Sequence, residues 1–235
     1  MSSYDIKQQH QDLYGPKPGN FTLVDVPPLG FLMIDGHGDP NTAPAYREAV
    51  EALFSTSYAV RSVARATLAR VHTVGPLEGL WSAVDLDTFR TRDKAAWDWT
   101  MMIVQPEWVT ADLVADGLAA ARRKRLPALA HLRFESFTEG RSAQILHVGP
   151  YDAEAPTIDR LHREFLPTHG LVPVGRHHEI YLSDPRRTEP ARLRTVLRQP
   201  VSTARDGARG HDVTMLDLGA TSSASREARG SQVPR

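Results

Sequence analysis

Apolar residues follow two different periods along the chain, and the change of period predicts where helices and strands lie. In one segment Tyr46, Val50, Leu53 and Phe54 recur at the spacing of a single helix face. Other segments alternate, or form short apolar runs bounded by Gly, Pro and Asp, which is typical of strands. The predicted helices are 43–55, 110–124 and 157–166, and the predicted strands are 21–26, 30–34, 68–74, 77–84, 97–104, 132–136, 143–148, 177–182 and 193–200.

The order of these elements predicts an α+β fold, because strands come in groups and do not alternate with single helices. A weak internal repeat divides the chain: 32–50 resembles 145–165, and 74–81 resembles 174–181. Each half, about 21–125 and about 126–202, is then a strand, a helix and a two-stranded hairpin. We expect the halves to be related by a pseudo-two-fold axis, with a ligand cleft at their junction and a carboxylate in an equivalent place in each.

Composition narrows the possible partners. Lysine and arginine number 28, aspartate and glutamate number 28, and cysteine is absent. Because the charges balance, the chain lacks the positive charge that dominates binding to nucleic acids, and we expect no nucleic-acid partner. The lack of cysteine excludes disulfides and thiolate chemistry. We expect no membrane contact and a cytoplasmic location, because we find neither a signal peptide nor a spanning segment. The folded domain is expected at 1–202, followed by a disordered tail, 203–235, which is rich in Ala, Arg, Gly and Ser.

Glu179 is the strongest candidate for chemistry. It lies in the middle of a predicted strand, where the period of two places it on one face with His177 and Tyr181. If that face is buried, the pKa of the carboxyl rises and suits a general base or a counter-ion for a cation. If the strand lies at an edge, the same face is simply solvated.

Glu78 and the tryptophans form a second group of candidates. Glu78 is either an acidic wall of the cleft or a hairpin charge, and Gly79 beside it favours a close approach of ligand or backbone. Trp97, Trp99 and Met101 share one face of a predicted strand, where they fill a core or, with Trp81 on the neighbouring strand, line a flat aromatic pocket. His147 also lies on a predicted strand, as a ligand contact or a local hydrogen-bonding group.

Metal and cofactor motifs are absent from the sequence. His177 and His178 point to opposite faces of a strand, so they cannot chelate one ion together. No phosphate-binding loop, dinucleotide fingerprint or nucleophile elbow is found. We therefore expect neither a metal nor a cofactor.

Three separated motifs resemble the GyrI-like small-molecule-binding domain proteins. They are Phe31–Gly36 with the following Gly38–Asn41, then Pro76–Trp81, and then His178–Pro185. The resemblance implies a fold of two tandem β-α-β-β (SHS2-type) modules with a central cleft. It also implies that Glu179 is the central acid, that Trp81, Trp99 and Glu78 wall the cleft, and that Tyr58 is a pocket tyrosine.

Two functions follow from the resemblance. Stand-alone members resemble cyclopropanoid hydrolases, which open the strained ring of DNA-alkylating compounds with water and so detoxify them. Glu179 would then be the base, Glu78 or Tyr58 would hold the water, and Tyr181, Tyr58 or a histidine would stabilise the developing oxyanion. Other members only bind lipophilic aromatic compounds, cationic ones included, and a gyrase-inhibitor type of protein contact is a weaker third alternative.

Overall fold

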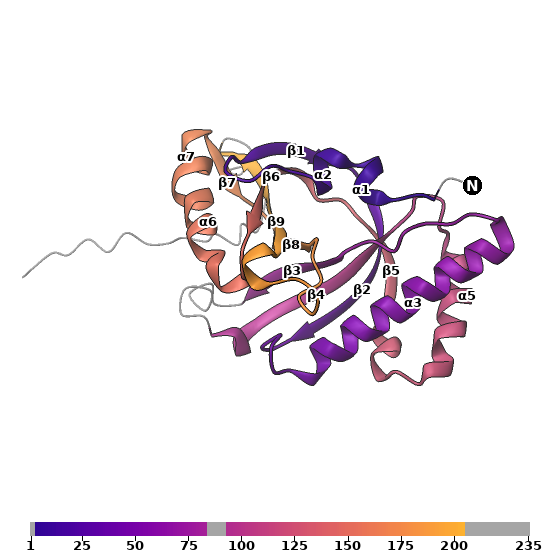
Figure 1. Ribbon diagram of the computed structural model, residues 1–235. Helices are drawn as coiled ribbons and strands as arrows, with labels where there is room; N and C mark the ends of the chain where they lie inside the picture. Colours follow the sequence, from indigo (N-terminus) through magenta and orange to yellow (C-terminus); the bar gives the residue numbers. More distant parts are fainter. Residues whose placement is uncertain (1–2, 84–92, 205–235) are drawn as a thin grey trace, which may run out of the picture.

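The computed structural model describes residues 3–83 and 93–204 (Figure 1). Nine antiparallel strands form one large sheet in the order β1-β6-β9-β8-β3-β4-β2-β5, and β7 pairs with β9. The strands are β1 Thr22–Val26, β2 Leu29–His37, β3 Leu77–Ala83, β4 Trp97–Gln105, β5 Arg133–Phe137, β6 Gly140–Val148, β7 Leu171–Pro173, β8 His177–Tyr181 and β9 Arg194–Thr203. The helices are α1 Ile6–Gln9, α2 Gln11–Tyr14, α3 Pro44–Leu68, α5 Ala111–Ala121, α6 Ala155–Arg160 and α7 Leu166–Thr168, with a π-helical turn, η5, at Leu161–Phe165. The α+β class predicted from the sequence is confirmed.

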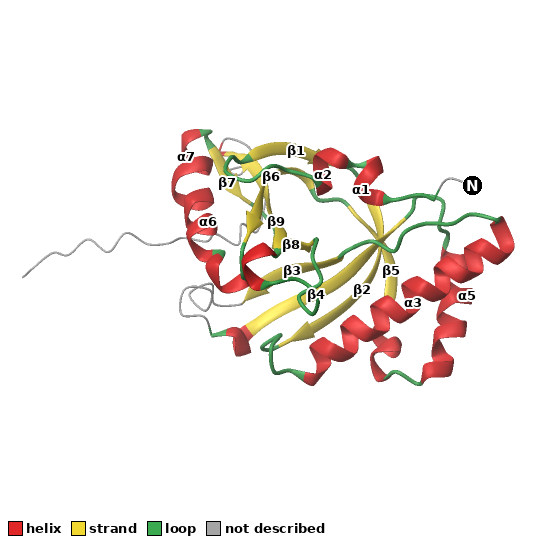
Figure 2. Cartoon of the chain, viewed as in Figure 1, coloured by secondary structure: helices red, strands yellow, loops and turns green. Residues whose placement is uncertain are grey.

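The sheet is strongly curled. β1 and β2 lie near opposite ends of the strand order, yet only residues 27 and 28 join them. Three peptide steps span at most about 11 Å, so the two ends of the sheet come close to one another. The same holds for β5 and β6, which only residues 138 and 139 join. The sheet therefore has an inner face, covered by α1 and α2, and an outer face that carries the longer helices (Figure 2).

The connectivity repeats in the two halves of the chain. β2, α3, β3 and β4 come in this order in the first half, and β6, α6, β8 and β9 come in the same order in the second, where α7 and β7 lie between α6 and β8. In the sheet these strands stand as β6-β9-β8 next to β3-β4-β2, so β8 and β3 meet at the centre. This order is what two β-α-β-β modules produce when their hairpins pair side by side. β1 precedes the first half in sequence but pairs with β6 of the second half. β5 precedes the second half but pairs with β2 of the first half.

Helix α3 is longer than the sequence pattern predicted, and the strand predicted at 68–74 is wrong. The helix runs on to Leu68 because no Gly or Pro interrupts the chain between Pro44 and Gly75. It ends at Ala69, which adopts the left-handed conformation with φ of 52°. Between Ala69 and Pro76, in the described part of the chain, the β pairing is a single bridge between His72 and Tyr4. Thr203, the first residue of the predicted tail, is the last residue of β9, and residues 205–235 lie outside the described part of the chain.

The outer face has two helical covers with different roles. α3 packs against α5 so closely that a Cβ on Gly117 would lie 2.5 Å from Val60 Cγ2. These helices bury Leu32, Ile34 and Trp99 in the larger core. On the other half, α6, η5 and α7 cover a smaller core around Ala143. Of the helices in the described ranges, none is long and apolar enough to cross a membrane.

Candidate functional site

A large cavity lies between the two helical covers, over the strands where the halves of the sheet meet. Its volume is about 2080 Å³. One wall comes from α3, the opposite wall from η4 (Tyr151–Ala153), α6 and η5, and the floor from β3 and β8. Among its lining residues are Tyr46, Phe54, Trp81, Trp97, Tyr151, Glu154, Glu179 and Tyr181.

Glu179 lies on the floor of this cavity. In the register of β3 and β8 it pairs with Gly79, and its neighbours His177 and Tyr181 pair with Trp81 and Leu77. The Tyr181 hydroxyl donates a hydrogen bond of 2.7 Å to Glu179 Oε2. The side chain is 16% exposed, so the strand face predicted to be either buried or solvated is largely buried, with access to the cavity.

An aromatic wall surrounds the carboxylate. Trp81 Nε1 donates a hydrogen bond of 3.2 Å to Tyr181 Oη, which makes a chain from indole to phenol to carboxylate. Trp81 also stacks on Tyr46 at 6.4 Å and meets Trp97 edge to face at 5.7 Å. Gly79 permits this arrangement, since a Cβ there would lie 3.0 Å from Trp81 Nε1. The close approach expected at Gly79 is therefore that of the indole.

A second carboxyl, Glu154, shares the cavity with Glu179. Burial is the main cause that raises the pKa of Glu154, and the charge of Glu179 raises it further, to about 9. Burial also raises the pKa of Glu179, while the Tyr181 hydrogen bond and then the charges of His178 and Lys94 oppose the rise. Two nearby carboxyls in a poorly solvated site cannot both ionise freely. One of the two carboxyls therefore keeps its proton, and the hydrogen bond from Tyr181 favours the charged form on Glu179.

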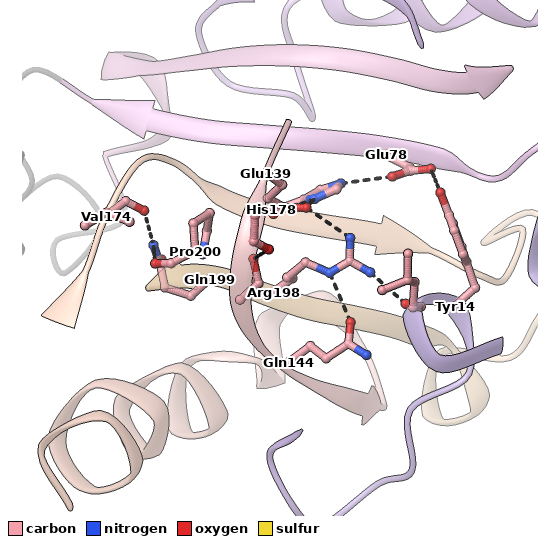
Figure 3. Close-up of polar contacts among 12 residues, drawn as sticks. Tyr14, Glu78, Glu139, Gln144, Val174, His178, Arg198, Gln199 and Pro200 are labelled. Atoms are coloured by element: carbon pink, nitrogen blue, oxygen red, sulfur yellow. Dashed lines mark hydrogen bonds and ion pairs between the residues drawn. The ribbon is translucent and has the colours of Figure 1, made fainter. Parts of the chain in front are cut away.

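Glu78 does not belong to this site. It lies on the inner face of the sheet, fully buried, where Tyr14 Oη donates 2.9 Å to its Oε1 and His178 Nε2 lies 3.0 Å from its Oε2 (Figure 3). His178 also contacts Glu139, which pairs with Arg198 at 3.0 Å. The hydrogen bonds among these side chains satisfy the charges inside the curled sheet. Glu78 is thus neither the predicted wall of the cleft nor a solvated hairpin charge.

The repeat explains why the expectation for Glu78 was wrong. Alignment of Val74-Gly75 with Val174-Gly175 makes Glu78 equivalent to His178 and Gly79 equivalent to Glu179. The sheet agrees, because Gly79 and Glu179 pair directly. The expected carboxylate in each half is therefore present in the second half only, and the glycine in the first half makes room for Trp81.

The other predicted residues divide between the cavity and the core. Trp81, Trp97 and Tyr181 line the cavity. Tyr58 also lines the cavity, at its mouth, and its side chain is 57% exposed. It lies within α3, whereas the sequence pattern predicted that it follows the helix. Trp99 and Met101 are buried in the core beneath the floor and do not line the cavity.

His147 lies outside the cavity. Its Nε2 is 3.3 Å from the backbone oxygen of Pro150, the local contact that was one of its two predicted roles.

Several cavity residues were missed by the sequence pattern. Glu154 precedes Ala155-Pro156, the start of α6, in a loop that carries no strand or helix periodicity. Tyr46 was assigned only to the apolar face of its helix, and Tyr151 only to the repeat. The signal that points to Glu154 is its place at the start of the repeated helix. No three His, Asp or Glu side chains lie close enough to hold a metal ion in the ranges 3–83 and 93–204.

Comparison with known proteins agrees with this geometry. Residues 19–202 match the GyrI-like small molecule binding domain. The chain belongs to the GyrI-like family. A solved structure of an uncharacterized conserved protein from Listeria innocua is 35% identical, with a TM-score of 0.78, and the match covers 85% of this chain and 100% of that one.

Two further Listeria innocua structures resemble this GyrI-like chain. Each is described as a hydrolase and is 33% identical to this chain. Their TM-scores are 0.76 and 0.74, and they cover 86% and 85% of this chain and 100% of their own. No curated protein matches the sequence. Small-molecule binding is therefore the function that the family supports directly.

Proposed function

We propose that this GyrI-like protein binds bulky lipophilic aromatic molecules in the cavity and hydrolyses cyclopropanoid alkylating compounds there, a detoxifying reaction. The observation that carries the proposal is the carboxylate of Glu179, buried under aromatic side chains and held by Tyr181 beside a second carboxyl. The cavity of about 2080 Å³ is large enough for a fused aromatic ligand. The Listeria relatives described as hydrolases support a reaction beyond binding.

The two carboxyls act as the general base and the general acid of the reaction. Glu179 is the base, because the Tyr181 hydrogen bond stabilises its charged form. Glu154 is the acid, because burial and the neighbouring charge keep its proton in place up to about pH 9. Such a split between neighbouring carboxyls is a general way of running both chemistries near neutral pH.

The reaction adds one water molecule to the strained ring. Glu179 takes a proton from water while the water oxygen bonds to the cyclopropane methylene. The carbon–carbon bond to that methylene breaks, and its electron pair moves through the conjugated ring to the carbonyl oxygen. Glu154 donates a proton to that oxygen, which becomes a phenol. Transfer of the proton from Glu179 to Glu154 restores the starting state, so atoms and charge balance.

This account changes two roles assigned from the sequence. Glu78 cannot hold the water, because it is bonded to Tyr14 and His178 on the inner face of the sheet. Tyr58 lies at the cavity mouth and serves the entry of the ligand. Trp81 and Trp97, together with Tyr46, provide the planar surfaces on which an aromatic ligand stacks.

The test is turnover of a spirocyclopropyl-cyclohexadienone in tenfold excess over protein, followed by mass spectrometry. Wild type should convert the whole excess to the water adduct, and Glu179→Gln should slow conversion by about 10²–10⁴-fold. Glu48→Gln, on the exposed side of α3 and outside the cavity lining, is the matched control and should keep the full rate. Full turnover by Glu179→Gln would show that Glu179 is not the base.

A non-catalytic role as a binding or sequestering module is the second candidate. The carboxylate of Glu179 among Trp81, Tyr46 and Tyr181 also suits a lipophilic cation. In that case the alkylator would remain unchanged beyond one equivalent, and Glu179→Gln would lose cationic ligands while it kept neutral ones. The same mass measurement, combined with dialysis of a neutral and a cationic aromatic probe, separates the two functions.

A further inference from the structure

One end of the cavity is polar and takes no part in the proposed reaction. His162 comes from η5, His177 from β8 and Gln199 from β9, and all three line the cavity. His178 pairs with Arg198 in antiparallel register, so His177 and Gln199 lie beside each other on the outer face of the sheet. His177 Nε2 is 3.7 Å from Glu179 Oε1, which puts this end next to the proposed base.

The polar atoms at this end lack partners within the described chain. His162 Nε2, both ring nitrogens of His177 and Gln199 Oε1 are buried and make no hydrogen bond to any described residue. Buried polar atoms are nearly always paired in folded proteins, so a cluster of this kind calls for an explanation. Elsewhere in the same sheet the buried groups around Arg198 are bonded to one another (Figure 3).

The hydrogen bonds of Gln199 show which of its side-chain atoms can accept a hydrogen bond from a ligand. Its Nε2 donates to the backbone oxygens of Val174, at 2.9 Å, and Pro200, at 3.2 Å (Figure 3). Both amide hydrogens are thereby used, the amide cannot turn over without losing them, and Oε1 remains as an acceptor. Gln199 is 1% exposed, so this acceptor is held in a buried wall of the cavity.

The two histidines are uncharged. Burial is the main cause that lowers the pKa of His177 to about 3, and the proximity of the imidazoles of His162 and His178, which disfavours a further positive charge, adds to it. Burial likewise lowers the pKa of His162. A neutral imidazole has one N–H donor and one acceptor nitrogen. The edge of His177 reaches the cavity, since the side chain is 13% exposed.

The backbone is irregular at the same end of the cavity. His162 lies in a π-helical turn, Leu161–Phe165, that interrupts the helix between Arg160 and Leu166. π-helical turns are rare in proteins, and those that occur are often found at functional sites.

We infer that His162, His177 and Gln199 form a specificity subsite that binds an uncharged group with both a hydrogen-bond donor and an acceptor, such as the carboxamide of an aromatic ligand. The inference rests on the proposed small-molecule cavity and adds an orientation to it. The polar end of the ligand lies at the histidines, and its aromatic body extends toward Trp81 and α3. An amide N–H meets Gln199 Oε1, and its oxygen accepts from an imidazole N–H.

Equilibrium dialysis of two isosteric probes tests the subsite. Wild type should bind naphthalene-2-carboxamide about 5–10-fold more tightly than 2-isopropylnaphthalene, the gain of one or two hydrogen bonds. His177→Phe and, separately, His162→Leu should bring the ratio close to one while 2-isopropylnaphthalene still binds, which also reports that the variant is folded. His131→Phe makes the same type of change at an exposed site outside the cavity and should keep the wild-type ratio.

The outcomes separate the subsite from the cavity itself. Equal binding of both probes by wild type, or a wild-type preference retained by both His177→Phe and His162→Leu, would overturn the subsite and mean that these atoms bind only water. Failure of both probes to bind wild type would instead count against the proposed small-molecule cavity.

Discussion

His178 and Glu179 are consecutive residues whose side chains lie on opposite faces of β8. His178 lies inside the curled sheet, 3.0 Å from both Glu78 and Glu139, and Glu179 lies in the outer cavity, 2.7 Å from Tyr181 Oη. The charged network on one face thus fixes the strand that presents the proposed base on the other. Stability and activity can therefore be probed separately with variants one residue apart.

Tyr181→Phe should shift the pH profile of turnover. The hydroxyl stabilises charged Glu179, so its loss raises the pKa of Glu179 and moves the acidic limb of the profile to higher pH. A hydrogen bond to a charged group is worth about 1.5–3 kcal/mol, or about 1–2 pH units. Initial rates of cyclopropane opening over pH measure the shift. An unmoved acidic limb would show that Tyr181 does not hold the catalytic carboxylate.

Glu154→Gln should remove the basic limb of the same profile. In wild type the rate should fall as Glu154 loses its proton near pH 9, the value to which burial and the charge of Glu179 raise its pKa. Glutamine cannot ionise, so the variant should be slow but without this fall. Glu51→Gln changes an exposed carboxyl at the cavity lining and should keep both limbs. A basic limb that persists in Glu154→Gln would assign the acid elsewhere.

The inner network should make stability depend on pH in a defined range. The pKa of Glu139 is lowered to about 2 because His178 and Arg198 favour its charged form over the cost of burial. A lowered pKa gives stability that is full above the unfolded value, about 4.3, and is lost as pH falls toward about 2. Urea unfolding between these limits should show the loss in wild type.

Glu139→Gln is the variant that tests this network. It should flatten the acid dependence and cost about 3–5 kcal/mol near neutral pH, since it removes the carboxylate partner of buried Arg198 and one of the two carboxylates at His178. Glu135→Gln, on a more exposed strand position, is the control and should leave the acid transition in place. An unchanged acid slope in Glu139→Gln would contradict the assignment.

Gly36→Ala should destabilise the outer core. A Cβ at Gly36 would lie 2.0 Å from Trp99 Cη2, and Trp99 is 2% exposed, so the indole has no free space to move into. Overpacking of this kind costs about 1–3 kcal/mol, to be measured as a lower thermal midpoint. Gly30→Ala should cost less, because its Cβ would meet only the ring edge of Phe134 at 3.1 Å. Equal effects of the two substitutions would refute the packing argument.

The sequence by itself determined the class of fold and the face of each central strand. Alternation on β8 is a local property of the backbone, so the shared face of His177, Glu179 and Tyr181 could be predicted without a structure. Helix α3 was predicted in place but ended too early, because several buried positions of its second half, Thr56, Ser57 and Ala64, are small or polar residues that give a weak apolar signal.

Only the tertiary structure decided which residues meet. The direct pairing of Gly79 with Glu179 sends Glu78 to the inner face, and this register is a long-range property of β3 and β8. Glu154 reaches the cavity from a loop with no pattern, and its raised pKa arises from burial and from Glu179, neither of which is local in sequence. Trp99 is buried and Trp97 lines the cavity although both share one strand face, because Gly36 leaves room for one indole beneath the floor. Periodicity specifies faces, whereas register, curl and burial specify sites.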